Sequence, residues 1–344
     1  MSETRRSNEL DGAARLVASA RARLAGAALE LRLPEGHRLT EWQRRTILAL
    51  LAGLVRSVED ELRSALAARL AADGHEALHA ALASAQVEIA APLLDAAAPW
   101  DSELVALLLR RAEEHRLQKG NAENALLVEL SGSDDEAIAG HAMALLVAQS
   151  RRLDSFREPL LPRSELPAEL EHGLVWTVAA SLRRYMIAEQ DLPPPLADSA
   201  LADAATAIFA RSDEGETFAA LALRLARALD AAGRLDDRLL ARMPGEAGLP
   251  LLLAALAVRT GLSIDACWEL IADGAARGSV LLLRAAGLSR DTAGTILFGL
   301  HGEDEHVLAE FDRFDGVDSH DAGSLLTLWR ADPAYRAAVA ALAA

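Results

Sequence analysis

Residues 261–297, GLSIDACWELIADGAARGSVLLLRAAGLSRDTAGTIL, decide the fold class. Near their start, four apolar residues recur at i, i+3, i+4 and i+7, which places them on one helix face: Ile264, Cys267, Trp268 and Ile271. The same spacing recurs downstream at Ala293, Ile296, Leu297 and Leu300. Between the two stripes, Gly287 predicts a helix end, and Ser289 predicts a side-chain cap for the next helix. The stretch therefore predicts short amphipathic helices joined by tight turns.

The rest of the chain favours the same kind of structure. Of its 344 residues 51% are hydrophobic but only 4% are aromatic, so Ala and Leu must supply most of the core. Both are good helix formers, and the residues that favour strands are scarce. A further helical stripe, with Asp101 or Ser102 as its cap, consists of Leu104, Val105, Leu108, Leu109 and Ala112. Composition and periodicity together predict an all-α fold.

Turn-forming residues interrupt the periodicity at short intervals. They are Asp73-Gly74, Pro99, Gly120-Asn121, Gly132, Gly233, Pro244-Gly245, Gly274, Gly287 and Gly302. In the first half we expect helices at about 58–72, 75–84, 87–97, 101–117, 121–131 and 134–149. Short helices joined by short turns are typical of HEAT and armadillo repeats, in which each helix pair covers the apolar face of its neighbour. The sequence thus predicts a HEAT- or armadillo-like α-solenoid.

Two proline-rich passages indicate how the chain is divided. Residues 154–167 (DSFREPLLPRSELP) have the character of an extended connector, and residues 190–196 (QDLPPPL) of a shorter stop. Between them Leu170, Leu174, Val178, Leu182 and Tyr185 mark a long helix. We expect an N-terminal helix pair at 1–57, formed by helices at about 8–31 and 40–57. A HEAT-like block at 58–153, the connector at 154–167 and a second helical block at 168–344 follow it.

Charge argues against nucleic acid as a partner. The formal net charge is -16 and the isoelectric point is near 5.0, whereas a duplex-binding protein needs a basic face to replace phosphate counterions. The first fifty residues are richer in arginine than in acids, and the C-terminal stretch is strongly acidic. A solvated surface explains this asymmetry better than a dedicated contact.

Several features predict a cytoplasmic protein. The longest uncharged apolar runs, residues 46–55 and 247–258, fall short of the roughly 20 residues that a membrane-spanning helix needs. The opening residues lack a long apolar core, so we expect no secretory signal. Cys267 is the single cysteine, which excludes an internal disulfide and a cysteine-based zinc site.

One passage carries a family resemblance. Residues 154–186 contain an aromatic-Arg-Glu-Pro-Leu start, a Leu-Pro-x-Glu-Leu step and a Trp-containing helix: Phe156, Arg157, Glu158, Pro159, Leu160, Leu166, Pro167, Glu169, Leu170, Trp176, Val178, Leu182 and Arg183. In these residues the chain resembles a bacterial family catalogued as domain of unknown function 2336. Residues 87–118 and 261–297 are similar to the family as well. The family often has two adjacent tryptophans where this chain has Trp176 followed by Thr177. The resemblance implies HEAT-like helices and brings no activity.

One string has the form of a zinc motif. His75-Glu76-Ala77-Leu78-His79 fits H-E-x-x-H, in which two histidines one helical turn apart bind zinc and the glutamate acts as general base. The downstream extension that would supply a third ligand is missing, since residues 80–86 contain no histidine. Two histidines near the exposed start of a short helix explain the string better. We therefore predict no metal, with His75 and His79 as the candidates if there is one.

The remaining chemical signals are weaker. There is no G-x-x-x-x-G-K-[ST] and no G-x-G-x-x-G, so no nucleotide loop is expected, and we expect no cofactor. The acidic stretch at 301–320 fails the spacing of a calcium loop, because Phe314 stands where an oxygen ligand is needed. Cys267 shares an apolar stripe and is expected to behave as a small buried hydrophobe.

Arginines are dense around the family-like passage: Arg151, Arg152, Arg157, Arg163, Arg183 and Arg184. Guanidinium groups suit phosphate or carboxylate ligands, so Arg157, Arg183 and Arg184 are the candidate binding residues. The acids Asp154, Glu158, Glu165 and Glu169 lie among them, and internal ion pairs are the favoured interpretation.

The function hypothesis follows from the predicted fold. A helical array without a reactive constellation is typical of a non-enzymatic protein-interaction scaffold or adaptor, whose partner is another protein. Two alternatives stay open: a metal-dependent hydrolase centred on His75, Glu76 and His79, and a regulatory homodimer joined through the basic N-terminal pair. Neither nucleic acid nor a membrane is expected as a partner.

Overall fold

The structure is a computed structural model of the chain. It describes residues 39–72, 74, 80, 93–94, 100–118, 124–211, 217–272, 276–317, 322–323 and 326–343. The chain divides into two compact units, Met1–Arg44 and Arg45–Ala344. The core and the candidate site described below belong to the second unit.

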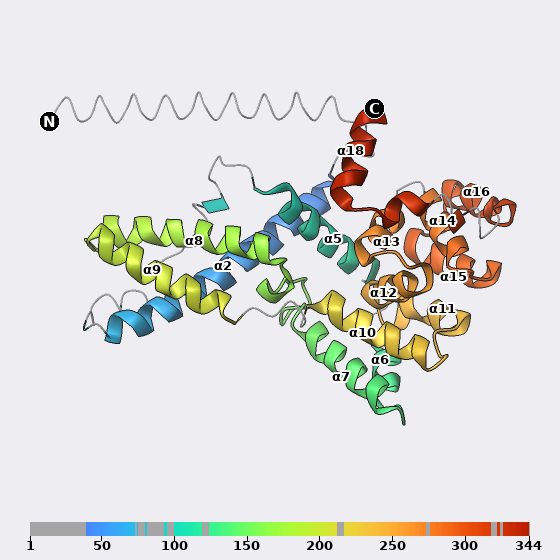
Figure 1. The fold of residues 1–344 in the computed structure, drawn as a ribbon, viewed down its shortest axis with the longest axis horizontal. Coiled ribbons are helices and arrows are strands. Elements are labelled where there is room, and N and C mark those ends of the chain that lie inside the picture. Colours follow the sequence, from blue (N-terminus) through green and yellow to red (C-terminus); the bar gives the residue numbers. More distant parts are fainter. Residues whose placement is uncertain are drawn as a thin grey trace. The chain divides into compact units, whose positions relative to one another are not determined.

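Helices account for the regular structure of the described ranges (Figure 1). No strand occurs in these ranges, and one isolated bridge joins Leu153 to Pro159. The prediction of an all-α fold is confirmed. The helices are α2 (Glu41–Ala72), α5 (Ser102–Gln118), α6 (Ala125–Ser131), α7 (Glu136–Ser150), α8 (Ala168–Ala188), α9 (Pro194–Phe209), α10 (Phe218–Ala231), α11 (Asp237–Glu246), α12 (Leu249–Thr260), α13 (Ile264–Ile271), α14 (Arg277–Ala285), α15 (Arg290–His301), α16 (Glu305–Asp312) and α18 (Pro333–Ala343).

α2 differs from the expectation. The sequence suggested one helix ending at residue 57 and a second starting at 58, but α2 runs unbroken from Glu41 to Ala72. Its buried stripe crosses residue 57 without a change of spacing, because Leu54, Val58 and Leu62 are all buried. No proline interrupts the segment, so every turn keeps its hydrogen bond. The expected boundary at residue 57 therefore falls inside a helix.

Local signals set most other helix ends. Ser289 caps α15 by accepting a hydrogen bond from the Thr292 amide, as predicted. Gly287 follows α14 with a φ of 72°, a left-handed conformation that glycine adopts at little cost, so the predicted stop is confirmed as well. Pro244 behaves differently from expectation: it lies inside the last turn of α11, which continues to Glu246.

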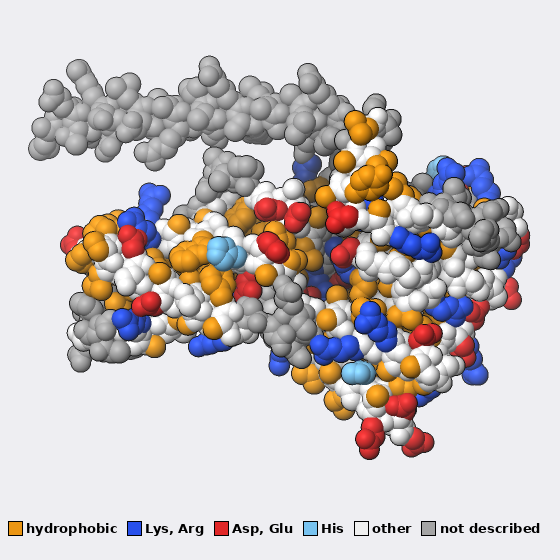
Figure 2. All heavy atoms as spheres, viewed as in Figure 1, with side chains coloured by type: hydrophobic (Ala, Val, Ile, Leu, Met, Phe, Trp, Pro, Cys, Tyr) orange, Lys and Arg blue, Asp and Glu red, His pale blue; other side chains and the backbone are white. Residues whose placement is uncertain are grey.

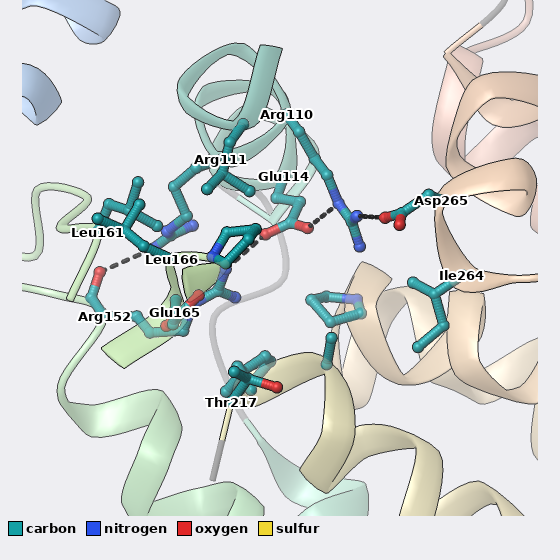
Figure 3. A pocket seen from close by; sticks show the side chains of 15 residues that line it. Arg110, Arg111, Glu114, Arg152, Leu161, Glu165, Leu166, Thr217, Ile264 and Asp265 are labelled. Atoms are coloured by element: carbon teal, nitrogen blue, oxygen red, sulfur yellow. Dashed lines mark hydrogen bonds and ion pairs between the residues drawn. The ribbon is translucent and has the colours of Figure 1, made fainter. Parts of the chain in front are cut away.

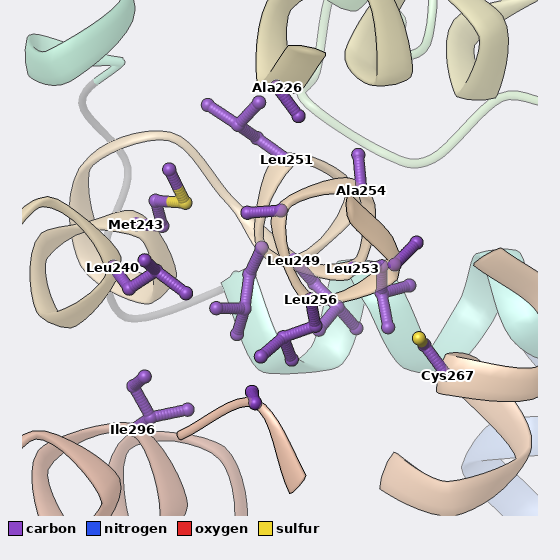
Figure 4. Packing of buried hydrophobic residues seen from close by; sticks show 14 of the residues in the cluster. Ala226, Leu240, Met243, Leu249, Leu251, Leu253, Ala254, Leu256, Cys267 and Ile296 are labelled. Carbon is purple, nitrogen blue, oxygen red and sulfur yellow. The ribbon is translucent and has the colours of Figure 1, made fainter. Parts of the chain in front are cut away.

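The main core surrounds α12. Residues 249–257 of this helix are all buried, which requires neighbours on every side, because a helix that is apolar all round cannot face water. Those neighbours are α5, α10, α11, α13 and α14. Figure 4 shows Leu251, Leu253 and Leu256 of α12 among Ala226, Leu240, Cys267 and Ile296 of the surrounding helices. The α13 and α15 stripes predicted from the sequence therefore pack against the core.

α8 and α9 pack against each other as a helix pair. α8 covers the predicted long helix, and four of its five expected stripe residues are buried: Leu170, Leu174, Val178 and Leu182. The connector before it is irregular, with one 3-10 turn at Arg163–Glu165. Within it Arg157 has a φ of 65°, an uncommon conformation for a residue with a side chain.

In the C-terminal region, the described residues form α16 and the 3-10 turns Phe314–Gly316 and Leu326–Arg330. Across the described part of the chain, no single helix is long and apolar enough to cross a membrane. The bent pair α12 and α13 meets the length and composition test only when taken together, with an angle of 111° between its halves.

Candidate functional site

α5 turns charged side chains toward the interior. Its buried face carries Leu104, Leu108 and Ala112, but Arg111, Glu114 and His115 share that face. Arg111 and Glu114 are each only 2% exposed. Charged groups at this depth need partners, because burial removes their hydration. Those partners come from segments distant in the sequence.

A network of ion pairs surrounds Glu114 (Figure 3). Glu114 accepts a hydrogen bond of 2.8 Å from Arg152 and one of 3.1 Å from Arg110. Arg152 Nε lies 2.9 Å from Glu165 Oε1, an ion pair without hydrogen-bond geometry. Arg110 reaches across to Asp265 of α13, 2.5 Å away. The network links α5, the connector and α13.

Arg111 is held by backbone oxygens instead of carboxylates. Its Nε donates to the Leu160 carbonyl at 2.9 Å, and its Nη2 donates to the Arg152 carbonyl at 2.6 Å. Its Nη1 is buried and has no hydrogen-bond partner among the described residues. A buried donor without a protein partner is costly, so such an atom indicates strain, a functional role, or a bound water or ion.

Burial and mutual charge shift the pKa values of this network. Burial, and next the charge of Arg152, lower the pKa of Arg111 to about 9. Burial raises the pKa of Glu165 against the opposing charge of Arg152. Burial acts in the same direction on Glu114, but Arg152 and Arg110 outweigh it, so the pKa of Glu114 is lowered. Of the two carboxyl groups paired with Arg152, Glu165 is thus the one that takes up a proton more readily.

A cavity of about 370 Å³ adjoins this network. We call it the arginine cavity. Its volume lies within the range of small-molecule sites. Its charged lining consists of Arg110, Arg111, Glu114, Arg152, Glu165 and Asp265. The other lining residues are Leu107, Leu161, Leu166, Pro167, Thr217, Phe218, Ala219, Pro250 and Ile264. A largely apolar wall with a few converging charges is typical of a binding site.

A second feature lies on the α8–α9 pair. The ring of His172 stacks on Phe209, with centroids 5.0 Å apart, and Trp176 donates its indole N–H to His172 Nε2 at 3.0 Å. Trp176 is 39% exposed. We call these three residues the aromatic surface. Figure 2 shows hydrophobic side chains gathered over α8 and α9.

The predicted binding residues do not form one site. Arg183 pairs with Asp198 of α9, in line with the internal ion pairs that the sequence favoured. Arg152 likewise forms an internal ion pair, with Glu165. Arg184 is exposed on α8, and Arg157 is exposed in the connector. None of Arg157, Arg183 and Arg184 lines the arginine cavity. Their role in binding stays a prediction.

The other candidates from the sequence are the His75-Glu76-x-x-His79 string and Cys267. His75, Glu76 and His79 lie outside the described residues. Within the described ranges, no group of three or more His, Cys, Asp or Glu side chains could hold a metal ion. Cys267 is buried on α13, as expected, and burial raises the pKa of its thiol to about 12. A thiol with so high a pKa is a poor nucleophile.

Comparison with known proteins places the chain in a family. A sequence model of the family described as "Uncharacterised protein conserved in bacteria (DUF2336)" matches residues 120–315, more than half of the 344 residues. The chain belongs to this family. No curated protein and no solved structure matches the chain. The region matched by the DUF2336 model contains Arg152, Glu165 and Asp265, whereas α5 precedes this region in the sequence.

The site residues of α5 were not predicted from the sequence. The predicted apolar stripe includes Val105 and Leu109, which are half-buried, whereas Arg111 lies at the buried centre beside Leu108. A signal was present, because Arg111 follows Leu104 and Leu108 at i+7 and i+3 and so occupies a stripe position. A charged residue at such a position predicts a buried partner or a ligand.

Proposed function

We propose that this DUF2336 protein is a non-enzymatic protein-interaction scaffold or adaptor. The aromatic surface is the observation that supports this proposal. Tryptophan is among the residues most enriched at the energetic centres of protein interfaces. The stacking of His172 on Phe209 and the hydrogen bond from Trp176 hold the rings in place before a partner arrives. Such preorganisation lowers the entropic cost of association.

The surroundings of Trp176 support the same interpretation. Between Glu169 and Arg184, the exposed residues of α8 are His172, Gly173, Trp176, Thr177 and Ala180. This face contains no Asp, Glu, Lys or Arg, although 25% of the whole chain is charged. The core of a protein interface is likewise depleted in charge and enriched in aromatic residues.

The finer description of the fold is part of the proposal. We propose that the helix pairs are HEAT-like repeats and that the protein acts in the cytoplasm. Packing of consecutive helices, α6 with α7, α8 with α9 and α13 with α14, supports repeat-like pairs. An experimental structure with successive pairs in a curved stack would support this description. Successive pairs that do not stack side by side would contradict it, and cell fractionation tests the compartment.

Site-specific photocrosslinking in cells tests the scaffold proposal. A photoreactive phenylalanine replaces Trp176 in one variant and Tyr335 in a control, because Tyr335 is an aromatic residue of α18 that is 60% exposed. We expect a reproducible adduct with another protein at position 176 and none at 335. Equal adducts at both positions, or none at either, would contradict the proposal. An adduct between two copies of the chain would instead indicate the homodimer.

A purified partner allows a quantitative check. Trp176→Ala is expected to weaken binding by about 2 kcal/mol or more, the loss typical of an interface hot spot. Tyr335→Ala should leave the affinity unchanged. Equal affinities of the Trp176→Ala variant and the wild type would contradict the assignment of the aromatic surface.

A further inference from the structure

We propose that the arginine cavity binds a small organic oxyanion, with a carboxylate or phosphate group at Arg111 and an apolar body against the hydrophobic wall. This site is separate from the aromatic surface, and the proposal does not depend on the scaffold function. Four observations carry it: the unpartnered buried donors, the helix ends around the cavity, the balance of charges and the shape of the lining.

The unsatisfied atoms of the lining are donors. Among the described residues, two buried side-chain atoms of the cavity lining lack a hydrogen bond, and both are guanidinium nitrogens: Arg111 Nη1 and Arg152 Nε. Arg152 Nε retains the ion pair with Glu165, whereas Arg111 Nη1 has no hydrogen-bond partner among the described residues. Guanidinium N–H groups bind carboxylate and phosphate oxygens with short, charge-assisted hydrogen bonds.

The first residues of three helices line the same cavity. Thr217, Phe218 and Ala219 are the cap and first residues of α10, Pro250 is the second residue of α12, and Ile264 and Asp265 begin α13. Thr217 and Ser263 already accept a hydrogen bond from one amide each of α10 and α13, and Pro250 has no amide N–H. The aligned peptide dipoles still leave partial positive charge at each of these helix starts. Helix N-termini therefore favour bound anions.

The formal charges of the lining balance before a ligand binds. Arg110, Arg111 and Arg152 face Glu114, Glu165 and Asp265 (Figure 3). Asp265 is 75% exposed at its side chain and is therefore well screened by water. Burial raises the pKa of Glu165, so this carboxyl group can take up a proton when an anion enters. Binding of an anion is thus linked to proton uptake at Glu165.

The rest of the lining fits an organic body. Leu107, Leu161, Phe218, Pro250 and Ile264 present apolar surface to the cavity. Inorganic phosphate would leave most of the roughly 370 Å³ to water. An anion with a ring or short chain would cover the apolar surface and place its charged end near Arg111. The ligand class is therefore an organic oxyanion.

Calorimetric titration of the full chain with small probes tests the proposal. Benzoate and phenyl phosphate represent the two possible charged groups, and benzyl alcohol is the neutral control. We expect at least one anion to bind and benzyl alcohol not to bind. Arg111→Met should weaken that binding by about tenfold or more, because it removes a hydrogen bond to a charged group.

Two further variants keep the test decisive if Arg111→Met unfolds. Asp265→Asn removes the carboxylate that pairs with Arg110 at 2.5 Å, so this lining guanidinium becomes available to the ligand and binding of the anionic probe should tighten. Glu165→Gln mimics the protonated carboxyl group, so it should tighten binding and flatten its pH dependence. Benzenesulfonate, which stays anionic over the whole range used, should bind the wild type more tightly as pH falls.

Three results would overturn the proposal. The first is that neither benzoate nor phenyl phosphate binds the folded wild type. The second is that benzyl alcohol binds as well as the anions, which would indicate an apolar cavity only. The third is that anion affinity is unchanged in Asp265→Asn and Glu165→Gln, and also in Arg111→Met where its circular dichroism is native.

Discussion

Arg152 lies at the centre of the buried network, and replacing it with methionine should destabilise the fold strongly. Its side chain is 7% exposed, pairs with Glu114 and Glu165, and stacks over Phe218 at 4.2 Å from guanidinium carbon to ring centroid. Breaking a buried ion pair by removing one partner typically costs about 3–5 kcal/mol, because the other charge stays buried. Glu114 keeps Arg110, so Glu165 is the group left without a charged partner.

Urea denaturation followed by far-UV circular dichroism measures the loss. Arg152→Met should unfold at a much lower urea concentration, with a slope similar to that of the wild type. The matched control is Arg183→Met, which breaks the exposed pair with Asp198 and should leave the midpoint unchanged. Equal midpoints for the two variants would refute the reasoning that burial makes the Arg152 pairs important.

The pH dependence of this loss gives a second check. Without Arg152, the burial of Glu165 is opposed only by the weaker effect of Arg111, so the pKa of Glu165 in the folded state should rise further above its unfolded value. A carboxyl group whose pKa is higher in the folded state than in the unfolded state stabilises the fold at pH values below the unfolded-state pKa. This stabilisation is lost as pH rises through the folded-state pKa. The loss in free energy of unfolding caused by Arg152→Met should therefore be smaller at acidic pH. Adding Glu165→Gln should recover part of the loss at neutral pH.

Four smaller predictions concern packing and burial. Gly278→Ala should destabilise the protein by about 1–3 kcal/mol, because its Cβ would lie 2.5 Å from the Leu270 carbonyl oxygen. Gly140→Ala, in an open position of α7, should instead stabilise it by about 0.5–1 kcal/mol. Thermal melts of the two glycine variants measure both changes. Leu253→Ala should cost about 2–5 kcal/mol in urea denaturation, because this α12 side chain is fully buried; an unchanged midpoint would contradict the central position of α12. The Cys267 thiol should react with a thiol reagent only after unfolding, since burial raises its pKa to about 12; rapid labelling of the native protein would contradict this.

Local signals predicted much of the secondary structure. The stripe of Ile296 and Leu300, the cap at Ser289 and the stop at Gly287 all depend on residues within a few positions of one another. Such information can be read directly from a sequence. The missed features in α2 and α11 have a local cause as well. A division was expected in α2 without a breaker, and Pro244 was treated as a stop although the last turn of a helix can contain it.

The arginine cavity could not be predicted in the same way. Its lining joins α5, the connector and the starts of α10, α12 and α13, which are far apart in the sequence. Periodicity shows which face of a helix is buried, but not which other helix will cover that face. Arg110 and Asp265, for example, are 155 positions apart and meet only in the folded chain. The dense arginines near the connector suggested Arg157, Arg183 and Arg184, whereas Arg111 carries a buried donor without a hydrogen-bond partner among the described residues.

The division of the ion network between two regions limits how the chain can be shortened. A fragment cut to the family match at 120–315 would keep Arg152, Glu165 and Asp265 but discard the helix that carries Arg110, Arg111 and Glu114. Arg152 would then lose its closest carboxylate, and α12 would lose one of the helices that cover it. Expression trials should therefore begin upstream of Ser102, and fragments that begin at residue 120 are expected to be poorly soluble.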